Sequence, residues 1–245
     1  MFAGFPEETI RFFLDLRFHN NAAFFHEQHD RYIQTVQTPF YDFIRELAPV
    51  MQEIDPLMEV RPHKCLSRIH RDTRFSRDKS PYRDHLWISF RRAAEIKDGS
   101  LNFWFELGPD NLSWGMGSWG ENKPLCERFR REMVADPMRI AAVVDRCDLA
   151  GHHLALQGSC YKRMSVPETL PQRLRPWYVM RDFYIQRTDV QRAWVFTERI
   201  AQEVRRDFVT LAPIYRMLRG MQDDVIAQER ALARQEHAQP RQDEW

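Results

Sequence analysis

The sequence lacks any run of apolar residues long enough to cross a lipid bilayer, so we expect no membrane-spanning segment and no membrane partner. Its first residues lack the basic and apolar regions of a secretory leader. The few cysteines form no C-x-x-C pair and no spacing typical of zinc sites: Cys65, Cys126, Cys147 and Cys160. Scattered cysteines suit a reducing compartment and small buried apolar side chains better than a disulfide framework. These absences predict a cytoplasmic protein.

Several common catalytic motifs are also missing. No G-x-G-x-x-G or Walker pattern predicts a nucleotide-binding loop, and no G-x-S-x-G elbow predicts a serine nucleophile. Metal coordination by His70, His85 and Asp72 lacks the support of any H-E-x-x-H spacing, so we predict no metal site. The cofactor, the reaction, if there is one, and the oligomeric state stay unknown at this stage.

The composition is that of a globular protein, with 245 residues, 43% of them hydrophobic and 13% aromatic. No glycine- or serine-rich linker marks a boundary, so we predict a single domain over residues 1–222 and a polar, disordered tail over residues 223–245. The net charge is only +1, yet residues 61–92 contain ten Lys and Arg against three Asp, a local net charge of +7. Positive charge is therefore concentrated in one segment.

The periodicity of apolar residues predicts helices at both ends of the chain and strands between them. Helical stripes occupy most of residues 7–54, residues 124–134 and 137–147, and a last segment around residues 200–211. Pro49 is expected to kink or end its helix, and Pro213 to start a new turn. Residues 86–91, 101–107 and 112–117 alternate as strands in a meander, with further strands near residues 65–70, 153–161 and 182–187.

We therefore predict an α+β fold with an antiparallel sheet of about four or more strands, packed against N-terminal and C-terminal helices. Within the third strand, Gly115 and Gly117 share one face. They indicate either a twist or bulge in an edge strand, or close approach of another backbone or a ligand.

The segment richest in charged side chains is the long loop over residues 68–82, between two predicted strands. Long ordered loops are often functional, and the apolar residues Ile69, Phe75, Pro81 and Tyr82 can anchor this one to the core. Guanidinium groups match the oxygens of phosphates and carboxylates. We predict binding of a phosphorylated or otherwise anionic small ligand by six residues of the loop: Arg68, Arg71, Asp72, Arg74, Lys79 and Tyr82.

In this hypothesis Asp72 orients the cations and Tyr82 lines the pocket. If a reaction follows binding, Asp72 and Asp78 are the acid–base candidates in the loop, and the neighbouring cations would have to tune their pKa values.

Two alternatives remain open. The alternating Arg and Asp residues can instead form a purely structural network of ion pairs. Alternatively, the loop belongs to a non-catalytic module that binds nucleic acid or a protein, because Tyr82, Trp87 and Phe90 add aromatic rings to the basic segment. The sequence pI of about 7.8 is low for a nucleic-acid-binding domain.

Three motifs together resemble a known but uncharacterised family, the domain of unknown function 2461. The first two are Phe2-x-Gly4-Phe5 and the pair Asn20 and Asn21 followed by Phe25. The third comprises Arg68, Ile69, Arg71, Asp72, Arg74, Phe75, Asp78, Lys79, Ser80, Pro81 and Tyr82. The resemblance extends over roughly residues 2 to 220, with Phe24 standing where the family often has Trp. It implies one domain and no established activity.

Overall fold

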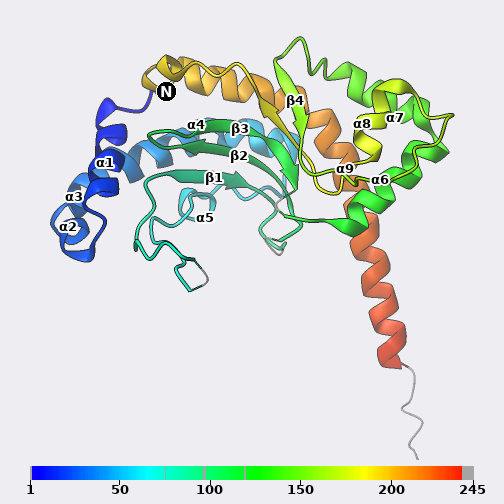
Figure 1. The fold of residues 1–245 in the computed structure, drawn as a ribbon, viewed down its shortest axis with the longest axis horizontal. Helices are drawn as coiled ribbons and strands as arrows, with labels where there is room; N and C mark the ends of the chain where they lie inside the picture. The colour runs from blue at the N-terminus through cyan, green and yellow to red at the C-terminus, as the bar shows by residue number, and fades with distance from the viewer. Residues whose placement is uncertain (1, 75, 96–97, 119, 239–245) are drawn as a thin grey trace, which may run out of the picture.

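A computed structural model of the chain describes residues 2–74, 76–95, 98–118 and 120–238. Its centre is a five-stranded antiparallel sheet in the order β1-β2-β3-β5-β4. The strands are β1 (Leu86–Phe90), β2 (Leu101–Leu107), β3 (Leu112–Ser118), β4 (Leu154–Gln157) and β5 (Tyr184–Arg187). Helices pack against the sheet, so the predicted α+β fold is confirmed (Figure 1).

The meander β1-β2-β3 forms because apolar residues occur at every second position. Leu86, Ile88 and Phe90 are buried, whereas the residues between them are only half-buried. The register places Ile88 opposite Phe105 and Phe105 opposite Trp114, so the apolar side chains of three strands meet on one face. The other face carries the alternate side chains and is here called the open face.

Two long helices cover the apolar face of the sheet: α4 (Thr38–Ile54) and α9 (Arg199–Ala238). Phe43 of α4 lies 4.6 Å from Phe105, and Phe208 of α9 lies 4.9 Å from Phe103, measured between ring centroids. Burial of such rings supplies much of the free energy that holds helices on a sheet. Neither α4 nor α9 covers the open face in this packing.

The remaining elements surround this core. Before α4 come α1 (Glu7–Phe18), α2 (Ala22–Glu27), α3 (His29–Tyr32) and the π-helical turn η1 (Ile33–Gln37). After β3 come α6 (Lys123–Ala135) and α7 (Pro137–Arg146). They confirm the two helices predicted there, with nearly the same bounds. Short helices fill the rest: α5 (Pro62–Cys65), η2 (Gln172–Leu174), α8 (Arg175–Tyr178) and η3 (Arg192–Phe196).

One of the two outcomes expected for Pro49, the end of its helix, is wrong. Pro49 lies inside α4, and Pro213 lies inside α9, and neither ends its helix. Each proline costs its helix one hydrogen bond. The apolar stripes nevertheless continue past both positions, to buried Ile54 in α4 and to buried Leu218 in α9, and this burial outweighs the loss.

The C-terminal segment also differs from expectation. We predicted a disordered tail from residue 223, but α9 continues to Ala238, and residues 239–245 lie outside the described residues. Ion pairs hold the first turn beyond residue 222, because Asp223 contacts Arg219 at 2.9 Å and Arg92 at 3.1 Å. Figure 1 shows the end of α9 projecting away from the rest of the chain.

The strand predicted near residues 65–70 is replaced by α5 and an extended segment that makes only isolated bridges among the described residues, one to β1 and one to the chain before it. Leu66 pairs with Ile88, and His70 pairs with Tyr82. Cys65 at the end of α5 is buried, as are Cys126 and Cys147, while Cys160 is exposed, contrary to the expectation that all four would be buried. The segment 66–70 therefore extends the open face beyond β1 without forming a regular strand.

Gly220→Ala is expected to raise the free energy of unfolding by about 0.5–1 kcal/mol, because glycine is a poor helix former. Outside the backbone of its own helix, a Cβ atom at this position of α9 would meet no atom of the described residues within 4 Å. Gly115→Ala is expected to have the opposite effect and lower the free energy of unfolding, since its Cβ would clash with the carbonyl oxygen of Ile185. Urea unfolding of both variants checks this; a destabilised Gly220→Ala would contradict the open environment of the helix.

Candidate functional site

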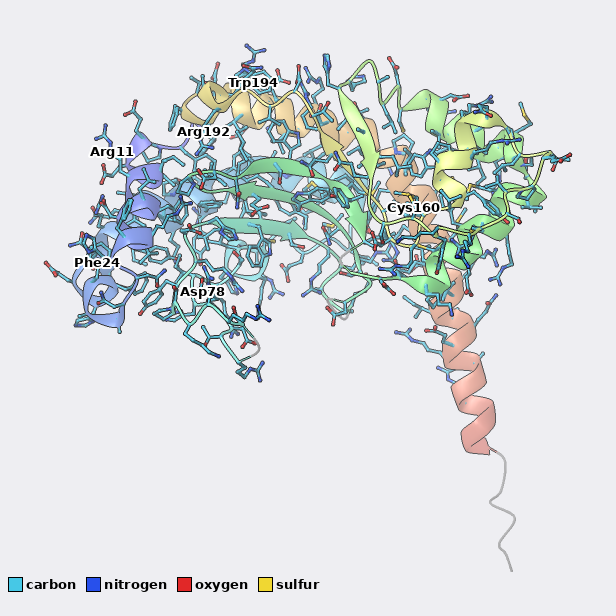
Figure 2. All side chains as sticks on the ribbon, in the orientation of Figure 1. Arg11, Phe24, Asp78, Cys160, Arg192 and Trp194 are labelled. Carbon is cyan, nitrogen blue, oxygen red and sulfur yellow. The ribbon has the colours of Figure 1, made fainter. Side chains whose placement is uncertain are left out.

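The loop over residues 68–82 is closed at its base by backbone pairing. The amide of Arg71 donates to the carbonyl of Pro81, and the amide of Arg83 donates to the carbonyl of Ile69, each at 2.8 Å. The side chain of Asn20 bonds both backbone groups of Tyr82, donating at 2.9 Å and accepting at 3.0 Å. The loop is thus fixed to the sheet and to the N-terminal helices at its base. In Figure 1 it extends from the β1 edge of the sheet, and Figure 2 places Asp78 on it.

Aromatic packing strengthens this attachment. The ring of Tyr82 stacks on Phe25, with centroids 4.3 Å apart, and contacts His70 at 5.1 Å. Tyr82 is buried rather than lining a pocket, since the ring of Phe25 takes up its face. Ile69 is buried as predicted, whereas Phe75, the other predicted anchor, lies outside the described residues.

Several charged groups of the loop bond to one another. Arg71 pairs with Asp78, and Arg74 pairs with Asp72 at 2.7 Å. The ammonium of Lys79 donates to the carbonyl of Thr73 at 2.9 Å. Part of the predicted cation cluster therefore serves the conformation of the loop itself.

The two carboxylates proposed as acid–base groups are held ionised. The side chain of Arg74 and then its backbone amide bond to Asp72 and lower its pKa to about 2. Hydrogen bonds from Ser80 lower the pKa of Asp78, with a further contribution from Arg71. With so low a pKa, Asp72 is a poor general base near neutral pH, and its protonated form is too scarce to act as a general acid.

A basic cavity of about 450 Å³ lies where the base of the loop meets β1. Its charged lining comprises five basic side chains and one carboxylate: Lys64, Arg68, Arg71, Asp72, Arg83 and Arg91. Ser67, His70, Trp87 and Ser89 also contribute to the wall. We call this space the basic cavity.

The cations of the basic cavity are only partly satisfied. Among the described residues, none accepts a hydrogen bond from the buried Nε of Arg71. Arg83 donates to the carbonyl of Arg68 at 3.0 Å, and its guanidinium lies 4.6 Å from the ring centroid of Trp87. Burial and then the positive charge of Arg71 lower the pKa of Arg83. Such crowding of desolvated positive charge favours the binding of an anion.

The structure brings together only some of the residues predicted from the loop. Arg68, Arg71 and Asp72 line the basic cavity, whereas Arg74, Lys79 and Tyr82 make the contacts given above. Sequence reasoning missed three of the charged lining residues, Lys64, Arg83 and Arg91. For Arg91 the signal was present, because it follows Trp87 and Ser89 at strand spacing and so shares their face.

A second cavity, of about 500 Å³, lies on the open face of the sheet. Trp104 and Tyr184 meet edge to face in its wall, with centroids 5.7 Å apart. Gly115 explains how the Trp104 indole can pack closely against β3, because a Cβ at residue 115 would come within 2.6 Å of the ring. Gly115 and Gly117 thus allow close approach of neighbouring groups to β3. This strand has β2 and β5 on its two sides and is not an edge strand. We call this space the open-face groove.

Polar groups gather at one end of the open-face groove. The Nδ1 of His85 lies 3.0 Å from Asp84, and its Nε2 lies 3.7 Å from Glu106. Glu106 accepts from Asn111 at 3.1 Å, and Arg17 donates to Asp84 at 2.6 Å. Burial alone raises the pKa of Asp84, but hydrogen bonds from His85 and Arg17 bring it below its ordinary value. Glu106 therefore adds a carboxylate to this end of the groove, whereas Asp84 does not line the groove and is paired with Arg17.

Comparison with known families gives one match. Residues 8–217 match a family described as a conserved hypothetical protein, DUF2461. The chain belongs to this family. The matched range includes both cavities and ends within α9. No curated protein and no solved structure matches the chain.

Membership of DUF2461 confirms the resemblance predicted from the three motifs, and its description names no activity. In the described part of the chain, no helix combines the length and apolar character needed to cross a membrane. Within the same residues, no group of three or more His, Cys, Asp or Glu side chains is arranged to hold a metal ion.

Proposed function

We propose that the protein binds a phosphorylated or otherwise anionic small ligand in the basic cavity. The observation that carries this proposal is the imbalance of charge there, with five basic side chains against the single carboxylate of Asp72. Asp72 is already paired with Arg74, so it neutralises little of the charge of Arg68 or Arg71. An anion would supply the missing acceptors.

Arg68 is the residue best placed to contact the ligand. Its side chain is exposed, and no described residue accepts a hydrogen bond from it, although its carbonyl is bonded to Arg83. Arg71 contributes its buried Nε, and Arg83 is held in place by Trp87. A purely structural loop has no need of these donors, because an ion pair with Asp72 already satisfies Arg74 and the carbonyl of Thr73 accepts from Lys79.

Arg68→Ala is expected to weaken the binding of pyrophosphate on the order of 10- to 100-fold, since a hydrogen bond to a charged group contributes about 1.5–3 kcal/mol. Isothermal titration calorimetry of the full chain at constant salt measures the change. The matched control is Lys79→Ala, which removes one positive charge from the same loop but outside the cavity. We expect its effect to stay below about threefold because salt screens distant exposed charges.

Three outcomes would count against the proposal. Absence of pyrophosphate binding by the wild-type chain would refute it directly. Equal losses in Arg68→Ala and Lys79→Ala would mean that the anion responds to the net charge of the loop and not to the cavity. Binding to single-stranded nucleic acid that strengthens with length and weakens steeply with salt would favour the nucleic-acid alternative.

A further inference from the structure

We infer that the open-face groove is the base subsite for the same ligand, which would be a nucleoside phosphate. This inference rests on the proposed function, because it needs the phosphate to bind in the basic cavity. It adds a second contact region for an aromatic base on Trp104 and Tyr184.

The two cavities adjoin on one face of the sheet. Trp87 of β1 lines both of them. Ser89 of the basic cavity lies directly opposite Trp104 of the open-face groove in the β1–β2 pairing. Side chains opposite each other in an antiparallel pair have Cβ atoms about 5 Å apart. One small molecule can therefore reach both spaces.

The walls of the open-face groove suit a flat ring. Trp104 is half-buried, and its orientation is fixed by Gly115 beneath it and by the hydrogen bond from its indole to Ser113 at 3.4 Å. Tyr184 stands at right angles to it, with an interplanar angle of 80°. A preformed aromatic platform loses little conformational entropy when a base stacks on it.

The charges of the two cavities are complementary to the two ends of a nucleotide. The basic cavity attracts the phosphate, while Glu106, which lies opposite Trp87 in the β1–β2 pairing, places a carboxylate in the open-face groove and makes it unfavourable for a second anion. An ionised carboxylate has about four acceptor positions, and Glu106 uses two of them for Asn111 and Ser113. The others can accept from the N–H groups of a base. This polarity disfavours a polyanion lying along the whole face.

The sequence has no glycine-rich phosphate loop, and this site requires none. Phosphate would be held by guanidinium groups from the loop and β1 instead of by backbone amides at a helix N-terminus. The combined volume of the two cavities lies within the range that proteins use for small ligands.

The experiment is calorimetry of the full chain with the four common nucleoside monophosphates, ribose 5-phosphate and pyrophosphate. We expect at least one nucleoside monophosphate to bind 10-fold or more tightly than ribose 5-phosphate. Trp104→Ala should remove this advantage, a loss on the order of 10- to 100-fold, and leave ribose 5-phosphate and pyrophosphate binding unchanged. Trp104→Phe should restore most of it, since it retains an aromatic face.

Glu106→Gln gives a second readout should Trp104→Ala fail to fold, because it keeps the shape of the side chain. It should alter the preference among the four bases without changing the affinity for pyrophosphate.

The outcomes separate the two proposals. If ribose 5-phosphate binds as tightly as every nucleoside monophosphate, the base subsite is refuted and the anion site stands. If none of the phosphates binds, both fall. An oligonucleotide that binds far more tightly than any monophosphate, with affinity rising with its length, would assign the open face to single-stranded nucleic acid and overturn the small-ligand proposal.

Discussion

Asp207→Ala is expected to lower the free energy of unfolding by about 3–5 kcal/mol, the loss typical of breaking a buried ion pair by removing one partner. Asp207 of α9 is fully buried, and its carboxylate contacts Arg187 of β5 at 2.9 Å. It also accepts from the indole of Trp114 in β3 at 2.8 Å. The substitution would leave a guanidinium and an indole N–H buried without this acceptor.

In the variant, the buried guanidinium of Arg187 still has carboxylates close to it. Its Nε still donates to Asp189 at 2.8 Å, and Glu203 lies 3.3 Å from its Nη1. We therefore expect a folded but weakened protein, and urea unfolding followed by tryptophan fluorescence measures the change.

The matched control is Asp224→Ala, which removes a carboxylate from the same helix. Asp224 is 59% exposed and pairs with Arg128 at 3.4 Å, so its loss should cost less than about 1 kcal/mol. A similar cost for the two variants would show that the contacts of Asp207 do not hold α9 to the sheet.

The second large effect is a dependence on pH. Asp55→Asn is expected to cost about 2–3 kcal/mol at pH 7, because hydrogen bonds to an ionised acceptor are stronger than those to an amide. The carboxylate of Asp55 is almost fully buried at the end of α4, where Arg92 and the hydroxyl of Tyr215 both donate to it at 2.7 Å. Burial alone raises the pKa of Asp55, but these two donors and the Leu57 amide bring it below its ordinary value.

A carboxyl group whose pKa is lower in the folded chain than in the unfolded chain stabilises the fold above the unfolded value, near 4. This contribution declines as the pH falls through the folded pKa. The difference in unfolding free energy between wild type and Asp55→Asn should therefore be constant above about pH 5 and shrink below pH 4.

Urea unfolding at a series of pH values checks this expectation. Asp42→Asn is the control on the same helix, since Asp42 is 51% exposed and, among the described residues, pairs only with Arg45. A difference for Asp55→Asn that does not change between pH 7 and pH 3 would mean that its carboxylate carries no net stabilisation.

Much of the fold was predictable because the strands bury one face. The alternation of Leu86, Ile88 and Phe90 specifies which side chains point inward, and short connections specify the meander. The continuation of helices through Pro49 and Pro213 was not predictable, since it depends on apolar contacts with distant parts of the chain. Helix propensity gives only the free-energy cost of proline in a helix. It does not give the apolar burial that offsets this cost.

The candidate site was predictable only in part. The high density of charged residues identifies the loop in the sequence, but sequence order does not reveal which cation pairs with which carboxylate. Arg74 bonds Asp72 two residues away, whereas Arg71 bonds Asp78 seven residues away, and these choices decide which donors are left for a ligand. Lys64 joins the basic cavity from α5, and Arg83 from the residues just before β1. The open-face groove required the register that sets Trp104 against Gly115.

The position of α9 in the chain affects folding during synthesis. This helix follows every strand, yet it carries Phe208 and Tyr215, whose rings pack on Phe103 in the apolar face of the sheet. On the ribosome, strands β1 to β3 leave the exit tunnel long before α9, so the part of their apolar face that α9 covers stays exposed for much of translation. A nascent chain in that state exposes a surface prone to aggregation and recognised by chaperones. Completion of the fold must await the last helix.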